Sequence, residues 1–180
     1  MTLPQFTYHP DPVGSGSVQP SSTVCVCCNQ TRGYVYVGPV YAIEEYEACI
    51  CPWCIVDGSA HERLGATFVD EDSIGLDGDA GLSDAQVAEV SQRTPGFSGW
   101  QQEAWFTHCN DAGQFIGKAG RAELLALGAE AIAAVQDTTG LEDGPQWQAF
   151  FEALDKDHGP TAYLFRCRHC ATLGAYQDCH

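Results

Sequence analysis

Ten cysteines, most of them in closely spaced groups, are the residues of this sequence whose types and spacing could do chemistry. Cys25 with Cys28 and Cys51 with Cys54 form two pairs of CxxC spacing. A CxxC pair presents two thiolates from one tight turn, and two such pairs can complete a tetrahedral site for Zn²⁺. We therefore predict a structural zinc site at these four cysteines.

Two other interpretations of this region stay open. Cys27 and Cys49 lie beside the pairs and leave the choice of ligands open, and Cys27, next to Cys28, is interpreted as a buried or spare thiol. The CPWC sequence from Cys51 to Cys54 also has the form of a redox motif, in which a helix N-terminus lowers the pKa of a thiol. No βαβ pattern precedes it and a second pair is available for a metal, so zinc is favoured over redox or disulfide chemistry.

A second zinc site is predicted where a third pair could join an isolated His-Cys dipeptide. The proposed ligands are His108, Cys109, Cys167 and Cys170. Adjacent side chains bind one ion with difficulty, so His169, Cys179 or His180 could supply the fourth ligand instead. The alternative without a metal is a core thiol beside a reduced pair on a hairpin.

Few other residues indicate catalysis. His9, His61 and His158 stand alone on polar stretches and are expected on the surface. Glu103 would not share a helical face with the predicted ligands of the second site, which disfavours it as a catalytic base. The acidic stretch 70–79 lacks the residue spacing of a calcium-binding loop and is predicted to be solvated.

Charge and composition limit the function classes. With 24 acidic against 8 basic residues the formal net charge is −16, so counterion release cannot drive binding to nucleic acid. No apolar run approaches the ~20 residues of a membrane helix. Residues 1–12 also lack the basic start and apolar core of a signal peptide. We expect a cytoplasmic protein whose cysteines stay reduced and available to a metal.

Short elements at both ends of the sequence must position the cysteine pairs. Residues 1–23 are rich in proline, glycine and serine and predict an extended arm. Residues 24–65 are predicted to form a first zinc-knuckle module, with a strand over 32–38, where β-forming residues alternate between glycines. Residues 161–180 predict a hairpin that carries the third cysteine pair at its turn.

The middle of the sequence, residues 83–158, is predicted to be mainly helical. Ser83 is a helix cap, Gly128 interrupts a Leu- and Ala-rich pattern, and Pro145 stands at a first helical turn. The predicted helices are placed where apolar residues recur at helical spacing. The predicted helices cover residues 84–93, 99–109, 121–136 and 146–156. Together the elements predict one α+β domain over 1–180, stabilised by zinc knuckles, with short β-hairpins near both ends of a helical middle.

Five motifs occur in order along the sequence: LPQFTYHPDPVGSGS, CVCCNQTRGYVYVGPVY, CPWCIVDGSA, TPGFSGWQQEAWFTHCNDAGQFIG and YLFRCRHC. As a set they resemble the CbrC family of bacterial proteins, whose name is tied to tolerance of a nuclease colicin. The resemblance implies a protective, immunity-like role and the same paired cysteines, with Cys109 in an HC motif. The sequence departs from the expected HCxDxC pattern at Gly113, which stands in place of the last cysteine.

We therefore expect a non-catalytic, acidic protein that holds one or two zinc ions and binds a basic, nuclease-type toxin. Nuclease domains attract phosphate, so an acidic surface can be steered onto them. The alternatives are a thiol oxidoreductase using Cys51 and Cys54, or a zinc hydrolase with an open metal position at His108 and Cys109. A third is a scaffold whose zinc knuckles hold a protein-binding surface.

Overall fold

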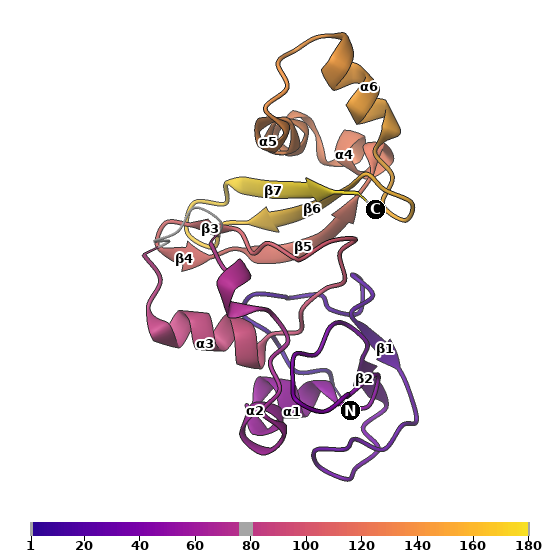
Figure 1. The fold of residues 1–180 in the computed structure, drawn as a ribbon, viewed down its shortest axis with the longest axis vertical. Coiled ribbons are helices and arrows are strands. Elements are labelled where there is room, and N and C mark those ends of the chain that lie inside the picture. Colours follow the sequence, from indigo (N-terminus) through magenta and orange to yellow (C-terminus); the bar gives the residue numbers. More distant parts are fainter. Residues whose placement is uncertain (1, 76–80, 180) are drawn as a thin grey trace.

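A computed structural model describes residues 2–75 and 81–179, and its centre is a three-stranded antiparallel sheet. The strands lie in the order β5, β6, β7, with Phe115 opposite Phe165. Their bounds are Gln114–Ala119 for β5, Thr161–Arg166 for β6 and Leu173–Asp178 for β7. Helices cover one face of the sheet, and the cysteine-rich N-terminal half lies beyond the other (Figure 1).

The hairpin predicted over 161–180 is confirmed, but its partner β5 was not anticipated. The central strand β6 is buried at every residue except its last, because it has neighbours on both edges and covered faces on both sides. In β5 the regular pairing is interrupted between Phe115 and Gly117, and Gly117 has a φ of 137°. This irregularity hides the alternating pattern by which a strand is recognised in a sequence.

Three helices form the layer above the sheet (Figure 1). They are α4 (Arg121–Leu127), α5 (Ala129–Thr139) and α6 (Pro145–Ala153). The break predicted at Gly128 is confirmed, since this residue, with a φ of 96°, separates α4 from α5. Pro145 begins α6 as expected. This layer packs against the sheet through buried side chains that include Leu124, Val135 and Trp147.

The opposite face packs on an aromatic cluster that includes Phe97, Trp105, Phe115, Tyr163 and Phe165. Helix α3 (Asp84–Arg93) borders this cluster, and the predicted cap is confirmed because the Ser83 hydroxyl accepts a hydrogen bond from the Gln86 amide. The rings of Phe97 and Phe115 stack with centroids 3.9 Å apart. Such contacts add to the area-dependent stabilisation from burial.

The helix predicted over 99–109 is wrong. The segment is extended, and the backbone of Trp105 exchanges hydrogen bonds with Ser73 and Gly75. The segment then enters a small hairpin made of β3 (Thr107–His108) and β4 (Asp111–Ala112). The aromatic residues at helical spacing therefore contribute to the core from an extended chain, and the middle of the sequence is helical only in parts.

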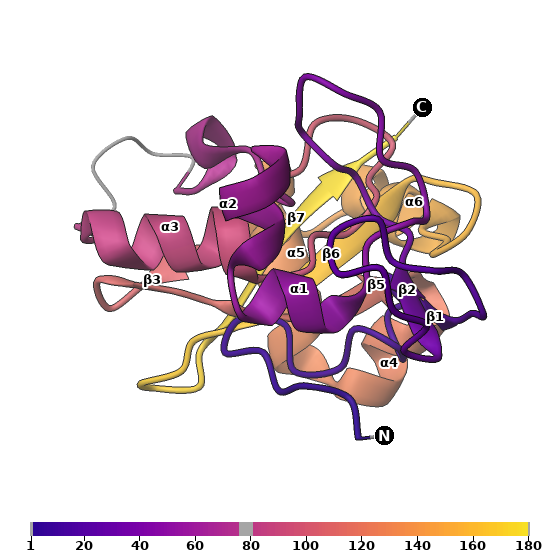
Figure 2. The same cartoon turned by 90° about the horizontal axis from the view of Figure 1, so that it is seen from below.

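The N-terminal module, residues 18–68, has its own small core built around the cysteines. Its elements are β1 (Val18–Pro20), β2 (Tyr34–Tyr36), α1 (Pro52–Val56) and α2 (Ser59–Leu64), followed by the 3-10 turn η1 (Glu71–Ser73). The strand predicted over 32–38 is confirmed by β2, which pairs with β1. Helices α1 and α2 pack beside α3, which joins the module to the rest of the chain (Figure 2).

The arm predicted over 1–23 is extended but not loose, because several of its side chains are buried. Phe6 enters the core of the N-terminal module, and Tyr8 enters the aromatic cluster. The expectation that His9 lies on the surface is wrong: it is 0 % exposed. Its Nδ1 lies 2.6 Å from the Pro95 carbonyl oxygen and its Nε2 lies 2.7 Å from Ser15 Oγ.

The α+β class predicted from the sequence is confirmed by this mixture of helices and small antiparallel sheets. Part of the acidic stretch 70–79, from residue 76 onward, lies outside the described residues. Within the described ranges no helix is long and apolar enough to cross a membrane.

Candidate metal centres

Four cysteines of the N-terminal module form the first cluster. The sulfur atoms of Cys25, Cys28, Cys51 and Cys54 all lie within 4.8 Å of one another. The separation is 3.9 Å between Cys25 and Cys54 and 3.6 Å between Cys51 and Cys54. Four sulfurs at about 2.3 Å from a tetrahedral zinc ion lie about 3.8 Å apart. The cluster therefore has the spacing of a four-thiolate metal site.

Backbone geometry presents these sulfurs to one another. A turn after Cys25 is closed by a 2.8 Å hydrogen bond from the Asn29 amide to the Cys25 carbonyl oxygen, and Asn29 takes a φ of 56°. Cys51 precedes the first turn of α1, with Pro52 at the first helical position. The Cys51 amide donates to the Cys25 sulfur at 3.3 Å. Hydrogen bonds of this kind orient metal ligands and favour the thiolate form.

The cysteines of the first cluster differ in how readily they ionise. Hydrogen bonding from the Cys51 side chain lowers the pKa of Cys25 to about 4, despite burial. The same hydrogen bond, together with burial, raises the pKa of Cys51, and burial raises that of Cys54 to about 12. One thiolate thus forms at the expense of its neighbours, because burial and the hydrogen bond to Cys25 keep the neighbouring thiols protonated. A metal ion would allow all four to ionise.

The two neighbouring thiols stand outside the first cluster. The buried sulfur of Cys27 lies 3.6 Å from Ser59 Oγ, and Cys49 is half-buried. Neither belongs to the four residues whose sulfurs converge. Cys27 and Cys49 therefore lie beside the four converging sulfurs, and Cys27 is buried as expected.

The second cluster combines the β3–β4 turn with the turn between β6 and β7. Its members are His108, Cys109, Cys167 and Cys170, whose ligand atoms also lie within 4.8 Å of one another. His108 Nδ1 is 3.2 Å from the Cys109 sulfur and 3.3 Å from the Cys170 sulfur. One imidazole and three thiolates are a common ligand set of structural zinc.

The adjacent residues His108 and Cys109 reach the same point because the chain reverses between them. Cys109 and Asn110 both have a φ of 55°, the left-handed conformation of a tight turn. His108 still belongs to β3, whereas Cys109 lies at the turn. The steric difficulty expected for adjacent ligands therefore does not arise.

The two clusters differ in exposure. Three of the four cysteines of the first cluster are buried. In the second cluster Cys167 is buried, whereas Cys109 and Cys170 are exposed. Hydrogen bonds from Thr172 lower the pKa of Cys170, and for Cys167 backbone hydrogen bonds from Cys170 and His169 outweigh the effect of burial and lower the pKa. The second cluster is thus the more accessible to reagents in solution.

The other ligands considered for the second cluster lie elsewhere. His169 Nε2 donates a hydrogen bond to Asp111 Oδ2 at 2.9 Å. Cys179 is exposed and lies outside the cluster. His180 lies outside the described residues. Gly113, the position of the cysteine implied by the family resemblance, accepts a hydrogen bond on its carbonyl oxygen from the Trp105 indole.

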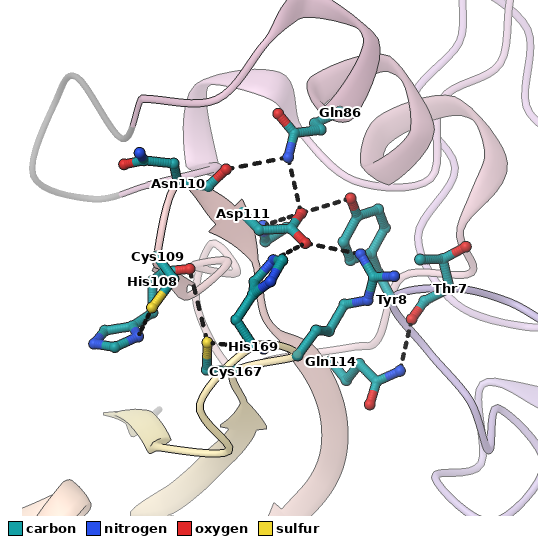
Figure 3. A network of polar contacts seen from close by, with 12 residues as sticks. Thr7, Tyr8, Gln86, His108, Cys109, Asn110, Asp111, Gln114, Cys167 and His169 are labelled. Carbon is teal, nitrogen blue, oxygen red and sulfur yellow. Dashed lines mark hydrogen bonds and ion pairs between the residues drawn. The ribbon is translucent and has the colours of Figure 1, made fainter.

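A polar network that local sequence patterns do not predict lies beside the second cluster (Figure 3). Its centre is Asp111, which is 4 % exposed and accepts hydrogen bonds from Tyr8, Gln86, Arg168 and His169. These donors come from the arm, from α3 and from the β6–β7 turn. The Asp111 carboxylate therefore joins three distant segments behind the cluster. No local pattern in the sequence signals such a network.

The remaining candidates from the sequence lie outside both clusters. Glu103 is buried, and its two carboxylate oxygens share the proton of the Tyr41 hydroxyl, whose oxygen lies 2.8 and 2.7 Å from them. His61 Nδ1 lies 3.2 Å from the Ala66 carbonyl oxygen, and His158 pairs with Asp155 on the surface. None of these three is among the clustered ligands of the described residues.

Comparison with known proteins gives a consistent family match without a named activity. The model of the family described as "Uncharacterised protein family (UPF0167)" matches residues 3–179. The chain is 46% identical over 178 residues to "UPF0167 protein Mb2317" of Mycobacterium bovis, covering 98% of this chain and 93% of the relative. It is 44% identical over 169 residues to "UPF0167 protein PA1536" of Pseudomonas aeruginosa, covering 93% and 92%. No solved structure matches.

Proposed function

This chain belongs to the UPF0167 family of uncharacterised proteins, and from that premise we propose that it is a non-catalytic, zinc-stabilised protein that binds a basic partner protein. The observation that carries the proposal is that each cluster brings together four ligands. A catalytic zinc site keeps one position for water or substrate, whereas a structural site is closed by four protein ligands. Both clusters have the closed form.

Zinc is the ion that suits these ligands. Thiolate and imidazole are soft or borderline donors, and the sulfur separations of 3.6 to 3.9 Å in the first cluster fit a tetrahedron. Cys25, Cys28, Cys51 and Cys54 would hold one ion, and His108, Cys109, Cys167 and Cys170 a second. In both places the ion would tie together segments that lie far apart in the sequence.

The charge of the chain indicates the chemistry of the partner. A formal net charge of −16 repels acidic surfaces and accelerates encounters with basic ones. The resemblance to the CbrC family, with its link to nuclease-colicin tolerance, narrows the proposal to a basic nuclease-type toxin in the cytoplasm. In that role the chain would cover the phosphate-binding groove of the toxin and would need no active site of its own.

The catalytic alternatives receive less support from the geometry. A thiol oxidoreductase using Cys51 and Cys54 needs an accessible nucleophile of low pKa, but Cys51 is buried and its pKa is raised. A hydrolase at His108 and Cys109 needs an open metal position, and both residues are ligand candidates in a complete set of four.

Two measurements test the proposal. Native mass spectrometry of the purified chain should give two zinc ions per chain, and cystines in place of metal would refute the structural role. Cells that express the chain should survive a nuclease colicin better than cells that carry an empty vector. Equal killing of the two cultures, with the chain folded and metal-loaded, would refute the protective role.

A further inference from the structure

A polar cavity of about 700 Å³ lies apart from both cysteine clusters. It is bounded by residues 37–47 of the N-terminal module and by the extended segment 97–103. Three of its lining residues are glutamates, Glu45, Glu47 and Glu103, and no lysine or arginine of ranges 2–75 and 81–179 lines it. The volume is within the range of sites for small organic groups.

The carboxylate of Glu103 is buried, and it forms no ion pair within the part of the chain that the structure describes. Glu103 is 5 % exposed, and its oxygens accept hydrogen bonds from the Tyr41 hydroxyl and, at 3.1 Å, from the Asp70 amide. No basic side chain in the described ranges forms an ion pair with it. Buried charges are usually paired because removing them from water costs free energy. The missing element at this site is therefore a positive charge.

The side-chain amide of Gln102 lies beside three oxygen atoms that can accept hydrogen bonds. Its Nε2 lies 3.3 Å from the Tyr41 hydroxyl, 3.2 Å from Asp70 Oδ2 and 3.3 Å from Glu103 Oε2. An amide nitrogen has two protons for these three acceptors, two of which are carboxylates. A guanidinium, with five donors and a positive charge, would satisfy the same acceptors better.

A second buried carboxylate lies behind the wall of the cavity. A Cβ atom on Gly99, which lines the cavity, would lie 3.0 Å from Asp178 Oδ2. Asp178 is 6 % exposed, and its Oδ1 has no hydrogen-bond partner among the described residues. Its Oδ2, the atom nearest Gly99, accepts hydrogen bonds from the Trp100 and Gln101 amides, so a second carboxylate is held beside this end of the cavity.

We propose that this cavity receives the guanidinium or ammonium group of an arginine or lysine side chain from a partner protein. The inference rests on the proposed binding of a basic partner and identifies where one of its side chains would enter. Glu103 and Tyr41 would contact the cation at the floor, Glu45 and Glu47 would attract it at the rim, and the ring of Tyr46 would flank its aliphatic stem.

Titration of the full-length, metal-loaded chain with a blocked Gly-Arg-Gly peptide tests the inference, read out by NMR shifts of the Gln102 side-chain amide. The citrulline peptide has the same shape without the charge and should bind at least tenfold more weakly. Binding of the arginine peptide should be about tenfold weaker in Glu103→Gln. It should be weaker by the same factor in the double variant Glu45→Gln with Glu47→Gln. The rim glutamates are exposed, so their double variant keeps the fold. Glu152→Gln on α6 is the matched control and should change nothing.

Equal binding of the arginine and citrulline peptides, or shifts that leave Gln102 unaffected, would overturn the inference. If methylguanidinium or spermidine binds more tightly than the peptide, the cavity is a site for a free small cation. That result would overturn the proposal that a side chain of a partner protein occupies it. The colicin assay separates the two proposals. If the wild-type chain protects cells and the rim variant protects equally, the cavity inference fails and the proposed function stands. If the wild-type chain gives no protection, the proposed function fails, and the peptide titration still decides what the cavity binds.

Discussion

The buried imidazole of His9 makes a quantitative prediction about acid sensitivity. Burial lowers the pKa of His9 from 6.5 to about 4, although the Pro95 carbonyl and Asp11 favour the charged form. In the unfolded chain His9 takes up a proton near its ordinary pKa, so between these two values the unfolded state binds more protons. The contribution of His9 to stability is therefore complete above pH 6.5 and is lost as the pH falls towards 4. The loss amounts to about 3 kcal/mol.

Urea denaturation of the wild-type chain and of His9→Gln, at several pH values from 7.5 to 4.5, measures this contribution. The variant should be less stable at pH 7.5, because it loses contacts with Pro95 and Ser15, and its stability should depend less on pH. Acid sensitivity of the cysteine clusters is common to both proteins and cancels in the difference. Parallel stability curves, or an NMR titration of His9 near 6.5, would refute the reasoning.

Three further predictions concern the metal centres and the network beside them. A chelator should remove one ion quickly from the exposed second cluster and the other slowly from the buried first cluster, and Cys170→Ser should abolish the fast phase; a single phase would contradict this. Replacing Cys51 and Cys54 by serine should unfold the N-terminal module, because structural zinc contributes about 10–16 kcal/mol in zinc-finger peptides; unchanged melting would remove the structural role. Asp111→Asn should cost about 2–3 kcal/mol and lower Tm by roughly 4–12 °C in calorimetry, since it removes the buried carboxylate charge that pairs with the exposed Arg168. A shift below about 2 °C would show that the pair contributes little.

Local signals in the sequence were sufficient to predict much of the helical framework and to select the candidate ligands. Ser83, Gly128 and Pro145 act through backbone chemistry that depends on neighbouring residues only, and the structure has each where it was expected. The cysteine candidates were found in the same way, because a CxxC turn brings its two sulfurs together regardless of the rest of the fold.

The features that the sequence did not predict depend on contacts between distant segments. Residues 99–109 have helical spacing, but hydrogen bonds between Trp105 and residues 73–75 keep the chain extended, so tertiary structure overrides propensity. His9 stands in a polar stretch and is buried only because the Pro95 carbonyl and the Phe115 ring lie against it. Likewise, the four donors to Asp111 converge from segments with no periodic relation to one another.

The order of the strands has a consequence for the growing chain on the ribosome. The first cysteine cluster uses only residues 25 to 54, so it can close early in synthesis. Strand β5 is made next, but its partner β6 follows only after three helices, and β6 also leads into the turn with Cys167 and Cys170. Until then the edge of β5 that pairs with β6 has unpaired backbone groups and is a site for mispairing. Translation halted between β5 and β6 would release a product with one finished metal site, one half-made site and an unprotected strand.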